Sequence, residues 1–159
     1  MKRPSYNNCI LALCVAVVLL LCLLSVRQPV HFQEECARRE ASVKQRLLKI
    51  RDAEENYRRR HGVYTGDLKA LVRGRYLADS LQYIPYAGGQ KFQLAASATV
   101  SKSGRQVPLM ECSAPYEAYL SGLDEAQVAG LTEQALGAGL YTGLKIGDIT
   151  TNNDNASNW

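Results

Sequence analysis

The chain contains little of the chemistry that enzymes use. Among its 159 residues there are two histidines, His31 and His61, and neither a CxxC pair nor a cysteine–histidine cluster with zinc spacing. It also lacks the phosphate-binding P-loop, the GxSxG motif of serine hydrolases and the HExxH motif of metalloproteases. These absences argue against the common enzyme classes. We predict a protein with no catalytic residues, no cofactor-binding residues and no metal ligands.

Charged side chains are also absent from a long run that begins at residue 9. The run Cys9–Val26 is 18 residues long, contains no charged side chain and has basic residues on both sides. A helix needs about 20 apolar residues to cross a bilayer, and an uncharged run of 18 or more is already a candidate. The sequence therefore predicts a transmembrane anchor over residues 9–26, which follows a cytoplasmic N-terminus over residues 1–8.

The same run could instead be a cleaved secretory signal, whose apolar stretch is about 7 to 15 residues long. The run is slightly too long for that, and cleavage after Ser25 would leave Leu23 at a position that needs a small side chain. We therefore expect an uncleaved anchor. Lys2 and Arg3 favour a cytoplasmic N-terminus, and large C-terminal domains cross the membrane largely regardless of charge.

Charge is unevenly distributed over the rest of the chain. Residues 27–61 contain ten Lys and Arg against six Asp and Glu, whereas residues 62–159 contain seven against nine. A nucleic-acid-binding protein would carry its basic patch on the folded domain, so we expect no nucleic-acid partner. The basic stretch is better explained as a solvated helix near lipid headgroups, where each Lys or Arg can gain about 1 kcal/mol beside an anionic leaflet.

Residues 27–61 are predicted to form a helical stalk that Gly62 ends as a left-handed C-cap. Four apolar side chains recur at three- and four-residue steps or their sums, and we take them as the candidate interface: Val43, Leu47, Ile50 and Tyr57. This stripe has two interpretations. It can pack on the chain's own distal sheet, chiefly through its C-terminal half, or its N-terminal half can pack on identical or related helices in an assembly.

Residues 62–150 are predicted to form a small α+β head, followed by an Asn-rich tail over residues 151–159 that we expect to be loose unless something holds it. The head is expected to begin with a helix from Thr65 or Asp67 to Val72, followed by three strands of an antiparallel meander over 81–86, 92–100 and 106–112. A helical segment over 115–120 comes next, and then a helix that opens at the Asp124–Gln127 capping box. A short strand over 144–149 ends the head.

The junction between stalk and head carries a distinctive pattern: Tyr57, Gly62, Tyr64-Thr65, Leu68, Leu71 and Tyr76-Leu77. With the order of anchor, long amphipathic helix and small meander, it resembles type IV pilin-like proteins, particularly the pseudopilins of type II secretion. Those proteins carry a similar Tyr…Gly-x-Tyr-Pro…Leu…Leu pattern at this place, although Thr65 replaces the Pro here and no prepilin peptidase signature precedes the anchor. The resemblance implies a structural or assembly subunit of a secretion or surface apparatus.

A second resemblance covers most of residues 38–159. The segments that carry it include Arg39-Glu40-Ala41-Ser42-Val43, Ala114-Pro115-Tyr116, Gly143-Leu144-Lys145-Ile146-Gly147 and Asn152-Asn153-Asp154-Asn155-Ala156-Ser157-Asn158-Trp159. They resemble a family of uncharacterised single-span envelope proteins from Bacteroidetes-type bacteria. This resemblance implies a location in the bacterial inner membrane, with a cytoplasmic N-terminus and a periplasmic C-terminal domain.

These features together predict a non-enzymatic envelope protein that contacts membrane lipid and has homo- or hetero-oligomeric partners through its stalk. The alternative is a stand-alone periplasmic binding module on a membrane tether. Such a module would hold cell-wall or peptide ligands at a group of tyrosines in the head: Tyr83, Tyr86, Tyr116 and Tyr119.

Overall fold

The computed structural model describes residues 6–100 and 104–159, with side chains described for residues 10–22, 31–100 and 104–159. The predicted N-terminal segment therefore lies mostly outside the described residues, and the predicted anchor, residues 9–26, extends beyond the described side chains at both ends. The chain divides into two units, Met1–Ala37 and Arg38–Trp159. The boundary falls within helix α1, Tyr6–His61, so the predicted stalk belongs partly to each unit.

The first unit consists of the N-terminal part of α1. Every side chain between residues 10 and 22 is exposed, and the large apolar ones between residues 10 and 21 are 45–66% exposed. Within the part of the chain that the structure describes, none of the helices has both the length and the apolar character needed to span a membrane.

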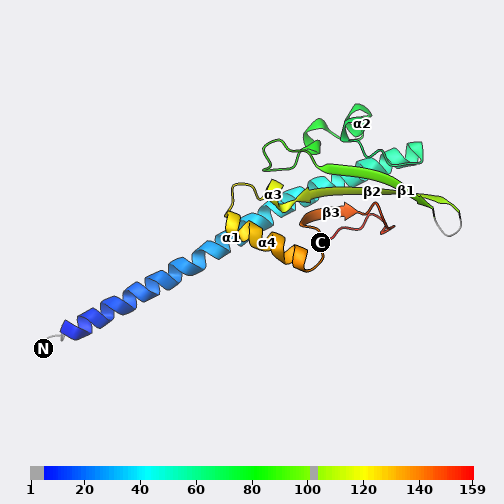
Figure 1. Ribbon diagram of the computed structural model, residues 1–159. Helices are drawn as coiled ribbons and strands as arrows, with labels where there is room; N and C mark the ends of the chain where they lie inside the picture. Colours follow the sequence, from blue (N-terminus) through cyan, green and yellow to red (C-terminus); the bar gives the residue numbers. More distant parts are fainter. Residues whose placement is uncertain (1–5, 101–103) are drawn as a thin grey trace. The chain divides into compact units, whose positions relative to one another are not determined.

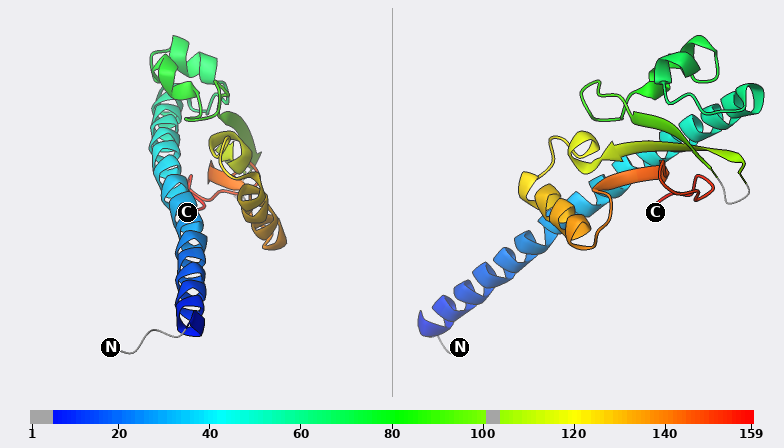
Figure 2. Two further views of the ribbon diagram at one scale, coloured as in Figure 1. Left: turned by 90° about the vertical axis from the view of Figure 1, so that its left-hand side faces the viewer. Right: turned by 45° about the vertical axis from the view of Figure 1, so that its right-hand side comes forward.

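The second unit confirms the predicted α+β class and the small antiparallel sheet. Its strands are β1 (Gln93–Val100), β2 (Gln106–Pro115) and β3 (Gly143–Gly147), in the order β1-β2-β3 with both pairs antiparallel. Figures 1 and 2 show the C-terminal part of α1 lying along this sheet. The core forms between the two. Its fully buried side chains include Val43, Leu47 and Ile50 from the helix and Met110, Cys112 and Ala114 from β2.

Met110, Cys112 and Ala114 alternate along the strand, which places them on one face of the sheet. The stripe on α1 supplies the opposite wall of the core. Burying a Leu or Ile side chain of this kind stabilises the fold by roughly 1.5–3 kcal/mol. The helix and the sheet therefore fold as one body from Arg38 onward, and α1 is part of the head as well as its support.

Two short helices begin where their capping residues predict. The Asp67 side chain accepts a hydrogen bond from the backbone N–H of Lys69 at 2.8 Å and begins α2, Leu68–Arg73. The Asp124 side chain accepts one from the backbone N–H of Gln127 at 3.0 Å and begins α4, Glu125–Gly137. Between these lies α3, Tyr116–Tyr119, directly after β2. Gly62, with φ +80°, ends α1 as expected.

The strand predicted over residues 81–86 is wrong. This segment contains a 3₁₀ helix, Asp79–Gln82, and a single isolated bridge between Tyr83 and Lys91. The Arg46 guanidinium of α1 donates hydrogen bonds to the carbonyl oxygens of Ser80 and Tyr83, so those acceptors face the helix and not a neighbouring strand. The third strand of the sheet is therefore β3, and not the predicted strand over residues 81–86.

The tail over residues 151–159 is held against β3. Gly147 N–H donates to the carbonyl of Ala156 at 2.9 Å, and the Lys145 N–H donates to the Asn158 side chain at 2.8 Å. Asn158 N–H donates back to the carbonyl of Lys145 at 3.1 Å, and Ile146 forms a bridge with Ser157. The tail thus pairs with the edge strand and satisfies backbone groups that would otherwise face solvent.

Candidate functional site

The predicted stalk interface lies inside the chain's own fold. Val43, Leu47 and Ile50 are 0% exposed, and Tyr57 is half-buried with its ring stacked on His61 at 4.2 Å between centroids. The edge of the Tyr57 ring also meets Tyr76, at 5.5 Å. Packing on the chain's own sheet, one of the two interpretations of the stripe, accounts for these positions. Val43, Leu47 and Ile50 are therefore not accessible for contact with another subunit.

The opposite side of α1 carries a continuous exposed stripe. Its members are separated by three or four positions, and we call them the exposed stalk face: Ala41, Gln45, Leu48, Asp52, Asn56 and Arg59. Leu48, at 36% exposure, is its large apolar residue. Lys49 and Arg60 are exposed beside it, which makes the surface predominantly basic. A face of this composition suits contact with an acidic partner surface.

Glu54 is the most unusual residue of the helix, because its ionisable side chain is fully buried. Its carboxylate accepts hydrogen bonds from the backbone N–H groups of Thr65 at 3.0 Å and Gly66 at 3.1 Å. Burial raises the pKa of Glu54 above 4.5, and the two backbone hydrogen bonds act in the opposite direction. This contact fixes the path of the chain as it leaves α1.

Gly66 completes the same turn. Its φ is +63°, and a Cβ atom at this position would lie 2.8 Å from the backbone nitrogen of Ala96 on β1. Only glycine combines the left-handed backbone with such a close approach. The Glu54 carboxylate and Gly66 thus join the end of the helix to the first strand.

Glu54 and its neighbour Glu55 lie in different environments. Glu55 pairs with Arg58, at 3.4 Å, but Glu54 points into the core. A signal for this was present, because position 54 continues the apolar stripe after Ile50 in steps of three and four residues.

A polar cluster ties the tail to the stalk. The Asn155 side-chain amide donates to the Glu55 carboxylate at 2.8 Å and to the Tyr64 hydroxyl at 2.7 Å. The Arg58 guanidinium lies 5.1 Å from the centre of the Tyr64 ring. Burial is the main cause that raises the pKa of the Tyr64 phenol. The polar groups of this cluster bind one another, which is typical of a structural role.

Arg39 organises the loops at the other end of the head. Its guanidinium donates to the carbonyls of Tyr119 at 3.1 Å and Ser121 at 2.8 Å, and it lies 4.8 Å from the centre of the Tyr86 ring. Arg39 and Arg46 belong to the basic stretch that was predicted to be solvated. Their acceptors could not be predicted, because these are backbone carbonyls far along the chain.

The predicted tyrosine cluster is only partly accessible. Tyr119 is fully buried, Tyr83 and Tyr116 are half-buried, and Tyr86 is 44% exposed. Tyr116 and Tyr119 lie 6.0 Å apart, and Tyr86 approaches them through Arg39. The four residues do not form one open aromatic surface, so Tyr119 is not positioned to touch a ligand.

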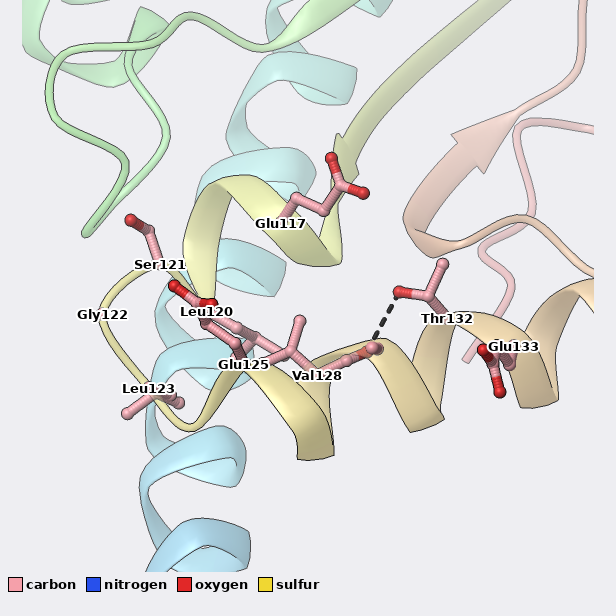
Figure 3. A pocket seen from close by; sticks show the side chains of 10 residues that line it. Glu117, Leu120, Ser121, Gly122, Leu123, Glu125, Val128, Thr132 and Glu133 are labelled. Carbon is pink, nitrogen blue, oxygen red and sulfur yellow. Dashed lines mark hydrogen bonds between the residues drawn. The ribbon is translucent and has the colours of Figure 1, made fainter.

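A groove lies between α3, the following loop and α4 (Figure 3). It has a volume of about 450 Å³, and its apolar lining consists of Leu120, Leu123, Val128 and Ala129. Three carboxylates surround that lining, Glu117 from α3 and Glu125 and Glu133 from α4. We call this the acidic groove. The Thr132 hydroxyl donates to the carbonyl of Val128 at 3.1 Å, so this polar group of the lining already has a partner.

A second cleft, of about 380 Å³, lies beside the end of the tail. Aromatic side chains line it, including Tyr116, Tyr141 and Trp159, and the Lys44 ammonium lies 5.6 Å from the Trp159 ring. Lys44 also pairs with Glu40 at 3.3 Å. Aromatic rings with a nearby ion pair suit contact with a ligand that has both apolar and hydroxyl-bearing surfaces.

Two titratable residues of β2, Cys112 and Glu111, are held within the fold. Cys112 is fully buried, and burial raises its pKa, which disfavours the reactive thiolate. Glu111 pairs with Lys145 at 3.2 Å across β2 and β3. Among the described residues, no three His, Cys, Asp or Glu side chains are grouped so that they could hold a metal ion.

No protein-family model, no curated protein and no solved structure matches this chain. Four of the surfaces described above suit contact with a partner or a ligand: an apolar helical segment, a basic stalk face, an acidic groove and an aromatic cleft.

Proposed function

We propose that the chain is a non-enzymatic, membrane-anchored envelope protein that serves as a pilin- or pseudopilin-like structural or assembly subunit. The observation that carries this proposal is the apolar helical segment over residues 10–22, whose side chains are all exposed. Exposed apolar surface costs about 25 cal/mol per Å² relative to burial, and contiguous patches of it are typical of membrane or protein contact sites. The uncharged run extends to Cys9 and Val26 in the sequence.

The charge distribution supports a location in the bacterial inner membrane with the head in the periplasm. Lys2 and Arg3 precede the uncharged run, which favours a cytoplasmic N-terminus. The basic residues of α1 follow it and would lie near the lipid headgroups. Residues 62–159 carry no net basic excess, in keeping with a role away from nucleic acid.

The use of polar groups within the head supports a structural rather than a catalytic role. Glu54 accepts two backbone N–H groups, Glu55 is bound by Asn155, and Glu111 is paired with Lys145. These carboxylates stabilise junctions between elements. In this proposal the segment in the membrane and the exposed stalk face bring subunits side by side, and the head presents its loops.

Alkaline extraction of membranes tests the anchor. The full chain should stay with the membrane pellet at high pH, as an integral protein does. Replacing Val18 and Leu19 together with Lys should release it, because a charge at the centre of a span costs about 2.5–3.5 kcal/mol on insertion scales. The matched control replaces exposed Leu136 of the head with Lys and should stay in the pellet. Release of the unchanged chain at high pH contradicts the proposal.

A second candidate function, a stand-alone binding module for cell-wall or peptide ligands, is favoured by the aromatic cleft. Trp159 is the single tryptophan of the chain, so its fluorescence reports on this cleft alone. This candidate predicts a saturable fluorescence change when a soluble cell-wall glycan fragment is added, and the loss of that change in Tyr141→Ala. It also predicts that the chain stays monomeric in membranes. Lateral cross-linking of copies without any such change favours the assembly subunit.

A further inference from the structure

We infer that the acidic groove receives the exposed stalk face of a second copy of this chain. The inference rests on the proposed function, because it names the surfaces through which neighbouring anchored copies would meet. One copy offers Glu117, Glu125 and Glu133 around an apolar groove, and the next copy offers the stalk face that contains Leu48.

The first argument is the incomplete burial of α4. In this helix of 13 residues, Ala135 is the one residue that the fold buries, while Val128 and Leu131 are half-buried. Leu136 is 63% exposed at the end of the helix. Most helical stability in proteins comes from packing of an apolar face and not from intrinsic propensity. A helix covered this little has apolar surface to gain from a partner.

The second argument is charge complementarity. Glu117, Glu125 and Glu133 give the groove three carboxylates and, among its lining residues, no basic side chain. The exposed stalk face and its flanks carry Lys49, Arg59 and Arg60 against Asp52, which pairs with Arg51 at 3.4 Å. Opposed patches of this kind raise association rates and set the register of a contact.

The third argument is the match of shape and direction. The groove, about 450 Å³, is lined by a helix, a loop and a second helix, and a helix that packs on such a surface inserts a ridge of side chains. Leu48 is the large apolar side chain of the stalk face that can pack against the half-buried Leu123 and Val128 of the groove. Copies inserted in the same membrane by this segment would hold their heads on the same side of it, so the stalk face of one copy can meet α4 of the next.

The contact is heterologous, since two different surfaces meet. Such contacts form rings when the rotation closes and open filaments when it does not. The stalk face and the groove belong to the same compact unit, Arg38–Trp159. Each copy can therefore be bound on both sides at once, which is the property that a repeating subunit needs.

Photo-cross-linking from the groove tests the inference. A photoreactive amino acid replaces Ala129, an exposed residue of the lining, in the full chain in lipid vesicles. Equal amounts of ¹⁴N- and ¹⁵N-labelled chains are mixed, so that mass spectrometry separates cross-links between copies from those within one. We expect cross-links between copies to fall on residues 38–61. Cross-links confined to one copy, to lipid or to other parts of a neighbour overturn the inference.

Charge reversal supplies a second measurement that does not depend on one probe position. Glu125→Lys with Glu133→Lys should reduce the cross-linked fraction about tenfold, and so should Lys49→Glu with Arg59→Glu, because each set opposes like charges. The two reversed chains mixed together should cross-link again, in the direction from reversed groove to reversed stalk. Lys69→Glu, an exposed reversal elsewhere on the head, is the matched control and should change nothing. No rescue in the mixture contradicts the pairing.

Vesicle flotation separates this inference from the proposed function. A chain that floats with vesicles but gives no cross-link from groove to stalk remains an anchored protein without this contact. A chain that does not float, yet cross-links from groove to stalk in solution, keeps the contact and loses the anchor.

Discussion

The side-chain amide of Asn155 donates a 2.8 Å hydrogen bond to the carboxylate of Glu55, 100 positions earlier in the chain. The same amide donates to the Tyr64 hydroxyl at 2.7 Å. One residue of the tail thus links the end of the stalk helix, the turn that follows it and the segment paired with β3. The stalk and the tail stabilise each other, although the tail has the sequence pattern of a solvated segment.

Asn155→Ala should destabilise the head by about 1–3 kcal/mol, because it leaves half-buried acceptors without their donor. The loss should be visible as a lower urea midpoint. It should also increase hydrogen exchange at the amides of Gly147 and Asn158, which pair the tail with β3. Asn153→Ala, at an exposed neighbouring position, serves as the control. Equal midpoints for the two variants would show that the linkage contributes nothing.

The buried carboxyl of Glu54 gives the head a distinctive pH dependence. Burial raises its pKa in the folded state, so its contribution to stability is fully present below the unfolded value of about 4.5 and is lost as the pH rises through the higher folded value. In Glu54→Gln this component disappears. We expect the free energy of unfolding of the natural chain, relative to that of the variant, to fall as the pH rises from about 4 to about 7.

Urea unfolding at a series of pH values measures this difference directly. Glu117→Gln, which alters an exposed carboxyl of α3, is the control and should leave the profile of the natural chain unchanged. A difference between the natural chain and Glu54→Gln that is constant with pH would mean that Glu54 titrates as it does in the unfolded chain.

Adjacent leucines of α1 should respond very differently to truncation. Leu47→Ala removes a fully buried side chain and should cost about 2–5 kcal/mol of stability, from lost burial and the cavity left behind. Leu48→Ala, one position away and 36% exposed, should change stability by less than about 0.5 kcal/mol. Calorimetry of both variants checks the assignment of the two helix faces. Similar losses would place both residues in the same environment.

How much the sequence reveals depends on whether the determining contact is local. Asp67 and Asp124 cap helices whose first turns directly follow them, and Gly62 ends α1 with its own backbone, so all three could be predicted. Helical periodicity is itself local, so the sequence identified Val43, Leu47 and Ile50 as a packing face, but it did not decide between the chain's own sheet and a partner helix. The continuation of this face to Glu54 was missed because a carboxyl is not expected to be buried.

The errors have the opposite origin. Residues 81–86 have the composition of a strand, but Arg46, more than 30 positions away, donates hydrogen bonds to the carbonyls of Ser80 and Tyr83. The tail has the composition of a solvated segment, but Asn155 and Asn158 find partners on the stalk and on β3. The acidic groove combines residues of two helices and a loop, and its carboxylates are individually unremarkable surface acids in the sequence. Such tertiary contacts leave little trace in local patterns.

The most direct test of the anchored arrangement is the accessibility of Cys14, near the middle of the uncharged run. In a variant with Cys9, Cys22 and Cys36 replaced by Ser, Cys14 and the buried Cys112 are the thiols that remain. A membrane-impermeant maleimide should label Cys14 at least about tenfold more slowly in intact vesicles than in detergent, because the reagent does not enter the bilayer core. A cysteine introduced at exposed Gln45 should react equally in both. Equal labelling of Cys14 with and without detergent would contradict membrane anchoring.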